Sequence, residues 1–240
     1  VNRKVINDYR SLHGLSKVSF THIIAHAIVR AISDAVPNMR NAYAVGADGK
    51  PQLVRNPHVN VGLAVDVDKG DGTRALVVPV LMNADTLSFA GFLVAYDDIV
   101  RKVKANKLTI ADFQGANVSI TNPGTIGTVQ SVPRLMPGQG VIVGVGSIDY
   151  PAEFQGSDPA NLNALGVSKV VTVTSTYDHR IIQGAESGLF LKRVHELLLG
   201  SHGFYNDIFR SLDIPYQPVE WSSDASPMNR EETMMEKQMQ

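Results

Sequence analysis

Several features are missing from this 240-residue chain, and each absence excludes a class of protein. There is no cysteine, which excludes disulfides, thiolate metal sites and a cysteine nucleophile, and which fits a reducing compartment. No apolar run approaches the roughly 18 residues of a membrane helix, and the N-terminus lacks a signal-peptide pattern. The net charge is −1 with scattered basic residues, so no basic patch indicates nucleic acid. We therefore expect a cytoplasmic protein that binds neither membranes nor nucleic acid.

The composition predicts a folded chain with a sizeable core. Hydrophobic residues make up 44% of the sequence, and the length fits one large domain or two small ones. The chain opens on Val1, and residues 229–238 begin like a helix that has no end signal. We therefore expect a piece of a longer polypeptide.

Hydrophobic spacing predicts a mixed α/β fold, with a mixed sheet and flanking helices. Apolar residues at helical spacing predict helices over residues 20–36, 88–106 and 184–199, the last closed by Gly200. β-rich runs predict strands at residues 60–68, 74–81, 117–122, 140–146 and 170–176. A Gly/Asp turn joins the first two strands, which predicts a hairpin.

Two sequence patterns resemble metal sites only in part. Residues 66–72 look like a calcium loop, but ligand position 5 is Gly70 and position 12 is Val77. His22 and His26 have the spacing of a zinc motif, but isoleucine replaces its glutamate and no third ligand is evident. We expect a hairpin turn, two histidines on a helix surface or at an interface, and no metal.

The glycines of residues 140–146 follow no phosphate-loop pattern, because the Lys-Ser/Thr ending is absent. They favour close backbone packing around a strand.

Residues 177–180 read Tyr-Asp-His-Arg, where a strand gives way to a helix. A lone histidine is usually structural, but flanking charges can anchor the turn and present His179 as a general base. Upstream, Ser119 and Thr121 offer hydroxyls at a strand end beside a Pro-Gly turn. A fixed base and a fixed hydroxyl donor are the minimum equipment for acyl transfer. The alternative is a structural histidine and two ordinary strand residues.

These segments resemble a known family. Residues 177–184 resemble the Asp-His-Arg-x-x-Asp-Gly signature of dihydrolipoamide acyltransferases, the transferase components of 2-oxoacid dehydrogenase complexes. Residues 119–127 resemble the family's Thr-Ile-Thr-Asn-x-Gly segment. Further matches follow in the same order, at residues 20–22, 76–80 and 107–113. The resemblance covers residues 16–200, and its motifs are specific as an ordered set.

The resemblance implies a fold similar to chloramphenicol acetyltransferase, assembled as a homotrimer with active sites between subunits. It implies that His179 takes the proton of a thiol and that Thr121 donates to the oxyanion of the tetrahedral intermediate. Coenzyme A and the dihydrolipoyl arm would be the substrates. The implied supporting residues are Ser119, Asn122, Asp178, Arg180 and Gln183. Gln183 stands where the signature has its second aspartate, so the support of the loop departs from the family pattern.

A narrower resemblance is to the transferase-like domain of fused actinobacterial 2-oxoglutarate dehydrogenases, carried by residues 121–124, 131–140 and 149–154. It implies succinyl transfer from dihydrolipoamide to coenzyme A in the tricarboxylic acid cycle. Thiamine diphosphate and magnesium would belong to a dehydrogenase portion outside this chain. No lipoyl module is visible, so the acyl carrier would be a lipoyl domain of another protein. The alternative is a scaffold domain that oligomerises the fused enzyme.

The expected organisation has three parts. Residues 1–200 form the acyltransferase domain, truncated at its N-terminus. Residues 201–222 form an appendage packed on it, because aromatic residues there stand among prolines and polar residues. Residues 223–240 begin a linker or helix towards the dehydrogenase portion.

Overall fold

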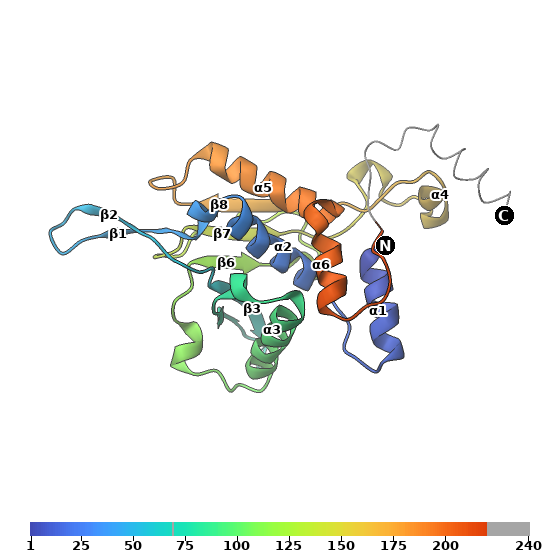
Figure 1. Ribbon diagram of the computed structural model, residues 1–240, viewed down its shortest axis with the longest axis horizontal. Coiled ribbons are helices and arrows are strands. Elements are labelled where there is room, and N and C mark those ends of the chain that lie inside the picture. The colour runs from blue at the N-terminus through green and yellow to red at the C-terminus, as the bar shows by residue number, and fades with distance from the viewer. Residues whose placement is uncertain (69, 220–240) are drawn as a thin grey trace.

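The computed structural model describes residues 1–68 and 70–219, so the linker expected at 223–240 and the end of the appendage lie outside the described residues. The main sheet has six strands in the order β4-β3-β6-β7-β8, with β5 paired to β3 (Figure 1). Its strands are β3 (Val61–Asp68), β4 (Arg74–Val77), β5 (Val80–Leu81), β6 (Val118–Thr121), β7 (Val141–Val145) and β8 (Val173–Tyr177). The longer helices are α1 (Asn2–Leu12), α2 (Phe20–Asp34), α3 (Phe89–Lys104), α5 (Gly184–Leu199) and α6 (Phe204–Ser211).

The sheet is mixed, as the sequence predicts. Strands β3, β6 and β7 are parallel neighbours, whereas β4 and β5 pair with β3, and β8 with β7, in antiparallel register. The predicted hairpin and all three predicted helices are confirmed, and α5 covers the predicted residues 184–199. The last strand begins at Val173, because Val170 forms an isolated bridge with Asp149 instead.

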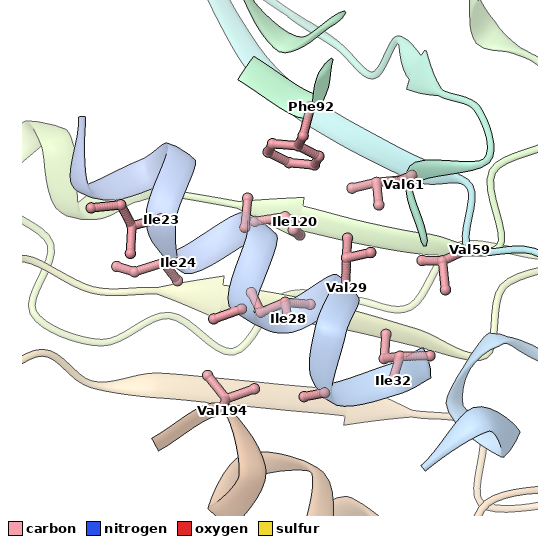
Figure 2. Packing of buried hydrophobic residues seen from close by; sticks show 14 of the residues in the cluster. Ile23, Ile24, Ile28, Val29, Ile32, Val59, Val61, Phe92, Ile120 and Val194 are labelled. Atoms are coloured by element: carbon pink, nitrogen blue, oxygen red, sulfur yellow. The ribbon is translucent and has the colours of Figure 1, made fainter. Parts of the chain in front are cut away.

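Helix α2 lies at the centre of the core. Its N-terminus is capped by Ser19, whose Oγ accepts from the backbone N–H of His22 at 3.2 Å. The helix packs between the sheet, Phe92 of α3 and Val194 of α5 (Figure 2). All residues from His22 to Val29 are buried, so this part of α2 is covered on all sides and its buried residues do not form a single stripe. Each fully buried isoleucine contributes about 1.5–3 kcal/mol to folding.

The two histidines of α2 are buried, so the prediction of a helix-surface or interface position is wrong in this fold. His22 is 7% exposed and His26 is 3% exposed. The ring of His26 lies among Phe89, Phe92 and Phe204, with centroids 5.2 to 5.8 Å away. Burial lowers the pKa of His26 to about 3, so the imidazole is neutral at physiological pH. His26 serves packing, and His22 accepts at Nδ1 from the N–H of Ser19 in the cap of α2 at 3.2 Å, neither of which the zinc-like spacing revealed.

Close backbone packing explains the glycines of β7, as predicted. A Cβ at Gly140 would collide with the carbonyl oxygens of Met39 and Asn41, and one at Gly146 with the carbonyl of Val129. Side chains are therefore excluded by neighbouring backbone rather than by a ligand.

A two-stranded arm projects from the body (Figure 1). It consists of β1 (Ala42–Val45) and β2 (Pro51–Val54), paired in antiparallel register. A short 3₁₀ helix, Pro37–Arg40, connects α2 to the arm. All four residues of β2 are exposed, so the arm is held to the body chiefly at its root.

The two ends of the described chain meet. Asn2 donates from Nδ2 to the carbonyl of Val219 at 2.8 Å and accepts at Oδ1 from its N–H at 2.7 Å. Tyr9 of α1 donates to the carbonyl of Asp213 at 3.1 Å. Helix α6 contributes three buried residues to the main core, namely Phe204, Ile208 and Phe209. A separate appendage beginning at residue 201 stays a prediction.

Candidate active site

His179 stands on a short loop between β8 and α5, residues 178–183. Its side chain is exposed, and its ring centroid lies 5.5 Å from that of Tyr177. The loop begins as a turn, because the N–H groups of Ile181 and Ile182 both donate to the carbonyl of Asp178. Ile182 is fully buried and anchors the loop, while Gln183 is exposed. The fold therefore presents the imidazole instead of enclosing it.

Asp178 and Arg180, the two sequence neighbours of His179, form an ion pair with each other. Arg180 donates from Nε to Asp178 Oδ1 at 2.8 Å and from Nη2 to Oδ2 at 2.6 Å. Its backbone N–H donates to Oδ1 as well, at 3.1 Å. These hydrogen bonds hold the pKa of the Asp178 carboxyl below its usual range, so it stays ionised. The guanidinium lies over the ring of Tyr43, 3.5 Å from the centroid.

The hydroxyl candidates lie at the C-terminal end of β6. Thr121 is half-buried and lines a cavity of about 360 Å³ together with Asn122, Thr21 and Tyr96. Asn122 donates from Nδ2 to Thr21 Oγ1 at 2.8 Å, which ties this strand end to the start of α2. Ser119 is fully buried, and its Oγ has no partner among the described residues. Of these two hydroxyl candidates, only Thr121 lines the cavity.

Glycine fixes the turn that follows Thr121. A Cβ at Gly124 would collide with the carbonyl of Gly146, so the 3₁₀ helix Pro123–Ile126 packs tightly against the end of β7. Only glycine permits this close approach.

The structure does not bring His179 and Thr121 together within one chain. Thr121 is in register with Gly144 of β7, and Gly144 with Thr174 of β8. Tyr177 lies three residues beyond Thr174 along β8, which is about 10 Å at 3.3 Å per residue. Strand β8 also lies two strand spacings from β6, which is about 10 Å across the sheet. The N–H of Asp178 donates to the carbonyl of Gly140, which precedes β7, so the chain continues away from Thr121. The two candidates thus occupy opposite ends of the sheet.

Residues that sequence reasoning missed hold the histidine loop from behind. Asn38 donates from Nδ2 to the carbonyl of Ile181 at 2.8 Å and to Glu186 Oε1 at 2.9 Å. Glu186 Oε2 accepts from the backbone N–H of Gln183 at 2.7 Å. The spacing of Gln183 and Glu186 is that of a helix-capping pattern and could have indicated the second contact. The contacts of Asn38 join segments more than 140 residues apart, and no local signal marks them.

Among the described residues, no group of three or more metal-ligating side chains is close enough to hold an ion. Over the same ranges, no helix combines the length and the apolar composition needed to cross a membrane.

Comparison with known proteins identifies the family. A family model described as the catalytic domain of 2-oxoacid dehydrogenase acyltransferases matches residues 2–202. Two curated relatives are named multifunctional 2-oxoglutarate metabolism enzyme. The protein of Mycobacterium sp. (strain JLS) is 55% identical and that of Mycolicibacterium vanbaalenii 53% identical, each over 93% of this chain. The chain spans only 17% and 18% of these relatives.

Solved structures share the fold. A probable dihydrolipoamide acetyltransferase from Listeria monocytogenes has a TM-score of 0.64 at 21% identity, over 91% of this chain and 82% of its own. The truncated catalytic core of a Thermoplasma acidophilum 2-oxoacid dehydrogenase complex has a TM-score of 0.64 at 23% identity, covering 82% and 81%. These likenesses confirm the mixed α/β fold with flanking helices. The chain belongs to the family of 2-oxoacid dehydrogenase acyltransferase catalytic domains, as its sequence motifs predict.

Proposed function

We propose that this domain transfers a succinyl group from dihydrolipoamide to coenzyme A within a 2-oxoglutarate dehydrogenase system of the tricarboxylic acid cycle. The family supplies the acyltransferase activity, and the 2-oxoglutarate relatives support succinyl as the acyl group. The observation that carries the proposal is that two chemically suitable side chains, those of His179 and Thr121, are accessible to a ligand. An exposed imidazole stands on a braced loop, and a hydroxyl lines an open cavity.

His179 is the general base in this proposal. A thiol with a pKa near 8.5 is only a few per cent thiolate at neutral pH, so a positioned base is needed. The imidazole takes the proton of the coenzyme A thiol, and the sulfur attacks the carbonyl carbon of the succinyl thioester. When the tetrahedral intermediate collapses, the bond to the dihydrolipoamide sulfur breaks and that sulfur takes the proton back from the imidazolium. No net oxidation occurs, and each thiol exchanges only a proton and an acyl group.

Thr121 stabilises the tetrahedral intermediate. Negative charge develops on the thioester oxygen as the sulfur attacks, and a hydroxyl already aimed at that oxygen needs no reorganisation. The Asn122–Thr21 hydrogen bond holds the strand end that carries this hydroxyl.

The site is completed by a second copy of the chain. Because His179 and Thr121 lie at opposite ends of one sheet, a hydrogen-bond reach of about 3 Å can be met only if the base of one subunit faces the hydroxyl of another. A homotrimer with sites between subunits satisfies this requirement. The solved cubic core of a pyruvate dehydrogenase complex, which has the same fold at a TM-score of 0.63, supports self-association.

A solved structure of the same fold supports a role for an amide at the place of Gln183. The dihydrolipoamide acetyltransferase of Azotobacter vinelandii was studied for the role of a serine, a histidine and an asparagine in its mechanism, and its histidine and asparagine lie four residues apart. His179 and Gln183 have the same spacing in this chain. The second candidate function, an assembly domain without activity, is favoured only by this replacement of the signature's aspartate.

The rest of the proposed enzyme lies outside this chain. A lipoyl domain of another protein would deliver the acyl group. A thiamine diphosphate- and magnesium-dependent dehydrogenase/decarboxylase portion would follow in the same polypeptide, consistent with the short share of the relatives that this chain covers. The cytoplasm remains the expected location.

Thioester exchange tests the proposal. The domain is incubated with dihydrolipoamide and succinyl-coenzyme A, and release of free coenzyme A is followed, with acetyl-coenzyme A as the comparison. We expect exchange with the succinyl thioester at a higher kcat/KM than with the acetyl thioester. Exchange with neither thioester by a folded, self-associated domain would favour the assembly function.

A further inference from the structure

The loop that carries His179 is braced by side chains from the root of the projecting arm. Asn38 and Tyr43 flank the point where the arm leaves the body, and both contact residues 178–183. Gly140 packs against the backbone of Met39 in the same segment, and its carbonyl accepts from the N–H of Asp178. Residues 38–43 therefore contact the middle of the loop, at Arg180 and Ile181, and Gly140 contacts its beginning at Asp178.

Asn38 connects two parts of the loop through a single amide group. Its two Nδ2 hydrogens are both used, one on the carbonyl of Ile181 and one on Glu186 Oε1. Glu186 in turn receives the backbone N–H of Gln183 on its other oxygen. The planar amide thus fixes the spacing between the loop backbone and the first turn of α5, and a carboxylate in its place has no hydrogen to donate.

Asn38 is itself held from the side of the arm. Its Oδ1 accepts from Asn41 Nδ2 at 2.9 Å, and Asn41 Oδ1 accepts from the backbone N–H of Asn56 at 3.1 Å. Asn41 is only 6% exposed, so water does not readily replace these bonds. Pro37, at the first position of the 3₁₀ helix, restricts the backbone just before Asn38. The side chain of Asn38 therefore has one defined orientation.

We infer that Asn38 is a positioning residue for acyl transfer: through Ile181 and Glu186 it fixes the loop that holds the His179 imidazole in place. The inference rests on the proposed role of His179 as base. Residue 183 is a neutral glutamine, so it cannot supply an ionic brace of its own at physiological pH. A displacement of about 1 Å at a catalytic group can cost about 10²-fold in rate. The hydrogen bonds from Asn38 that hold this loop therefore affect the rate of acyl transfer.

The test compares two asparagines with similar local roles. Asn38→Asp removes both donors and places a carboxylate beside Glu186. Asn7→Asp is the matched control, because Asn7 is also half-buried and donates to the backbone carbonyl of Val18 at 2.9 Å. It belongs to α1, which lies away from the start of α5 (Figure 1). Asn38→Ala, which removes the donors without adding a charge, serves if the aspartate variant does not fold.

We expect Asn38→Asp to lower kcat by about 10- to 100-fold, with the KM for coenzyme A nearly unchanged. Asn7→Asp should leave kcat nearly unchanged. In a His179→Ala background Asn38→Asp should have no further effect, because the group that it positions is gone. Near-normal kcat in Asn38→Asp, or an equal fractional loss in the His179→Ala background, would overturn the inference.

Amide hydrogen exchange tests the brace without relying on activity. Asn38→Asp should speed exchange at Ile182 and Gln183, whose N–H groups are bonded within the braced region, whereas Asn7→Asp should not. Unchanged exchange at these amides would overturn the inference whatever the activity. Faster exchange together with a His179→Ala variant of normal activity would instead show that the brace is real and that the proposed base is wrong.

Discussion

The two ends of the central sheet carry the two halves of the candidate site, and they are built differently. At one end Thr121 belongs to β6, which is paired with a strand on each side, and it lines a cavity to which Thr21 at the start of α2 also contributes. At the other end His179 stands exposed on a six-residue loop that depends on side-chain contacts with Asp178, Arg180, Asn38 and Glu186. The Thr121 hydroxyl is placed by backbone pairing, and the His179 imidazole is placed by side-chain contacts.

This difference has a functional consequence. A group placed by sheet hydrogen bonds keeps its position when one side chain is changed, whereas a group placed by a few side chains does not. We therefore expect substitutions of residues around His179 to displace the imidazole more often than substitutions around Thr121 displace the hydroxyl.

Removal of the base should have the largest effect. His179→Ala should lower acyl transfer by about 10²–10⁴-fold, the usual worth of a positioned general base. Because the side chain is exposed and its ring contact is with the half-buried Tyr177, the thermal midpoint of unfolding should change little. Steady-state transfer rates and a thermal melt check both parts. A folded variant that retains near-normal transfer would contradict the role of His179 as base and would favour the assembly function.

Removal of the hydroxyl at the other end should cost somewhat less. Thr121→Val keeps the β-branched shape that a strand favours and deletes only the hydroxyl. Loss of one oxyanion donor typically costs about 10²–10³-fold in turnover. Coenzyme A binding should change little, since the ground-state thioester carries no oxyanion.

Measurement of kcat together with the dissociation constant for coenzyme A separates these roles. An equal loss of affinity would mean that Thr121 binds the substrate. Unchanged turnover would move the oxyanion role to the backbone, because Ser119 is buried away from the cavity.

Protonation or substitution of His26 should change the stability of the fold. It should not act directly on either end of the candidate site. Its pKa is lowered to about 3 by burial, whereas an unfolded histidine titrates near 6.5. As the pH falls below about 6.5 the unfolded chain binds a proton that the folded chain excludes, so the folded state loses about 1.4 kcal/mol per pH unit until about pH 3. His26→Leu should flatten this dependence.

Urea unfolding at pH 6.5, 5.5 and 4.5 measures the slope of the free energy of unfolding against pH. Wild type and His26→Leu should differ by up to about 1.4 kcal/mol per pH unit. Equal slopes in the two proteins would contradict a neutral, buried His26.

The smallest effect is expected at position 183. Gln183→Asp restores the signature's carboxylate at the N-cap of α5, where aspartate is favoured, but adds a negative charge near Glu186. The glutamine contributes its backbone N–H to Glu186, and this bond survives the change. Transfer should therefore stay within a few-fold of normal or improve. A large loss in a folded variant would show that the loop has been rebuilt around the amide.

Local features of the fold could be predicted from the sequence. Helix α5 begins and ends where its apolar spacing and Gly200 predict, and Gly200 has the left-handed φ of 107° that such an end requires. The hairpin between β3 and β4 follows from its Gly/Asp turn. The resemblance to the acyltransferase family also placed His179 and Thr121 as candidates from residues alone.

Long-range features could not be predicted in the same way. The opposite placement of Thr121 and His179 depends on the register of three strands, and strand pairing leaves little trace in local sequence. The burial of His22 and His26 depends on which elements surround α2, so their polar type misled the surface interpretation. The hydrogen bond from Asn38 to Ile181 joins residues 143 positions apart in the sequence, so no local pattern marks it.

Subunit mixing tests the central claim, that base and hydroxyl come from different copies of the chain, most directly. His179→Ala and Thr121→Val subunits, each expected to keep at most about 1% of wild-type turnover alone, are unfolded, mixed in equal amounts and refolded together. If each site pairs the His179 end of one subunit with the Thr121 end of the next around a ring, random mixing should restore about a quarter of wild-type activity. Mixtures no more active than the separate variants, in an assembly shown to contain both chains, would contradict a site shared between subunits.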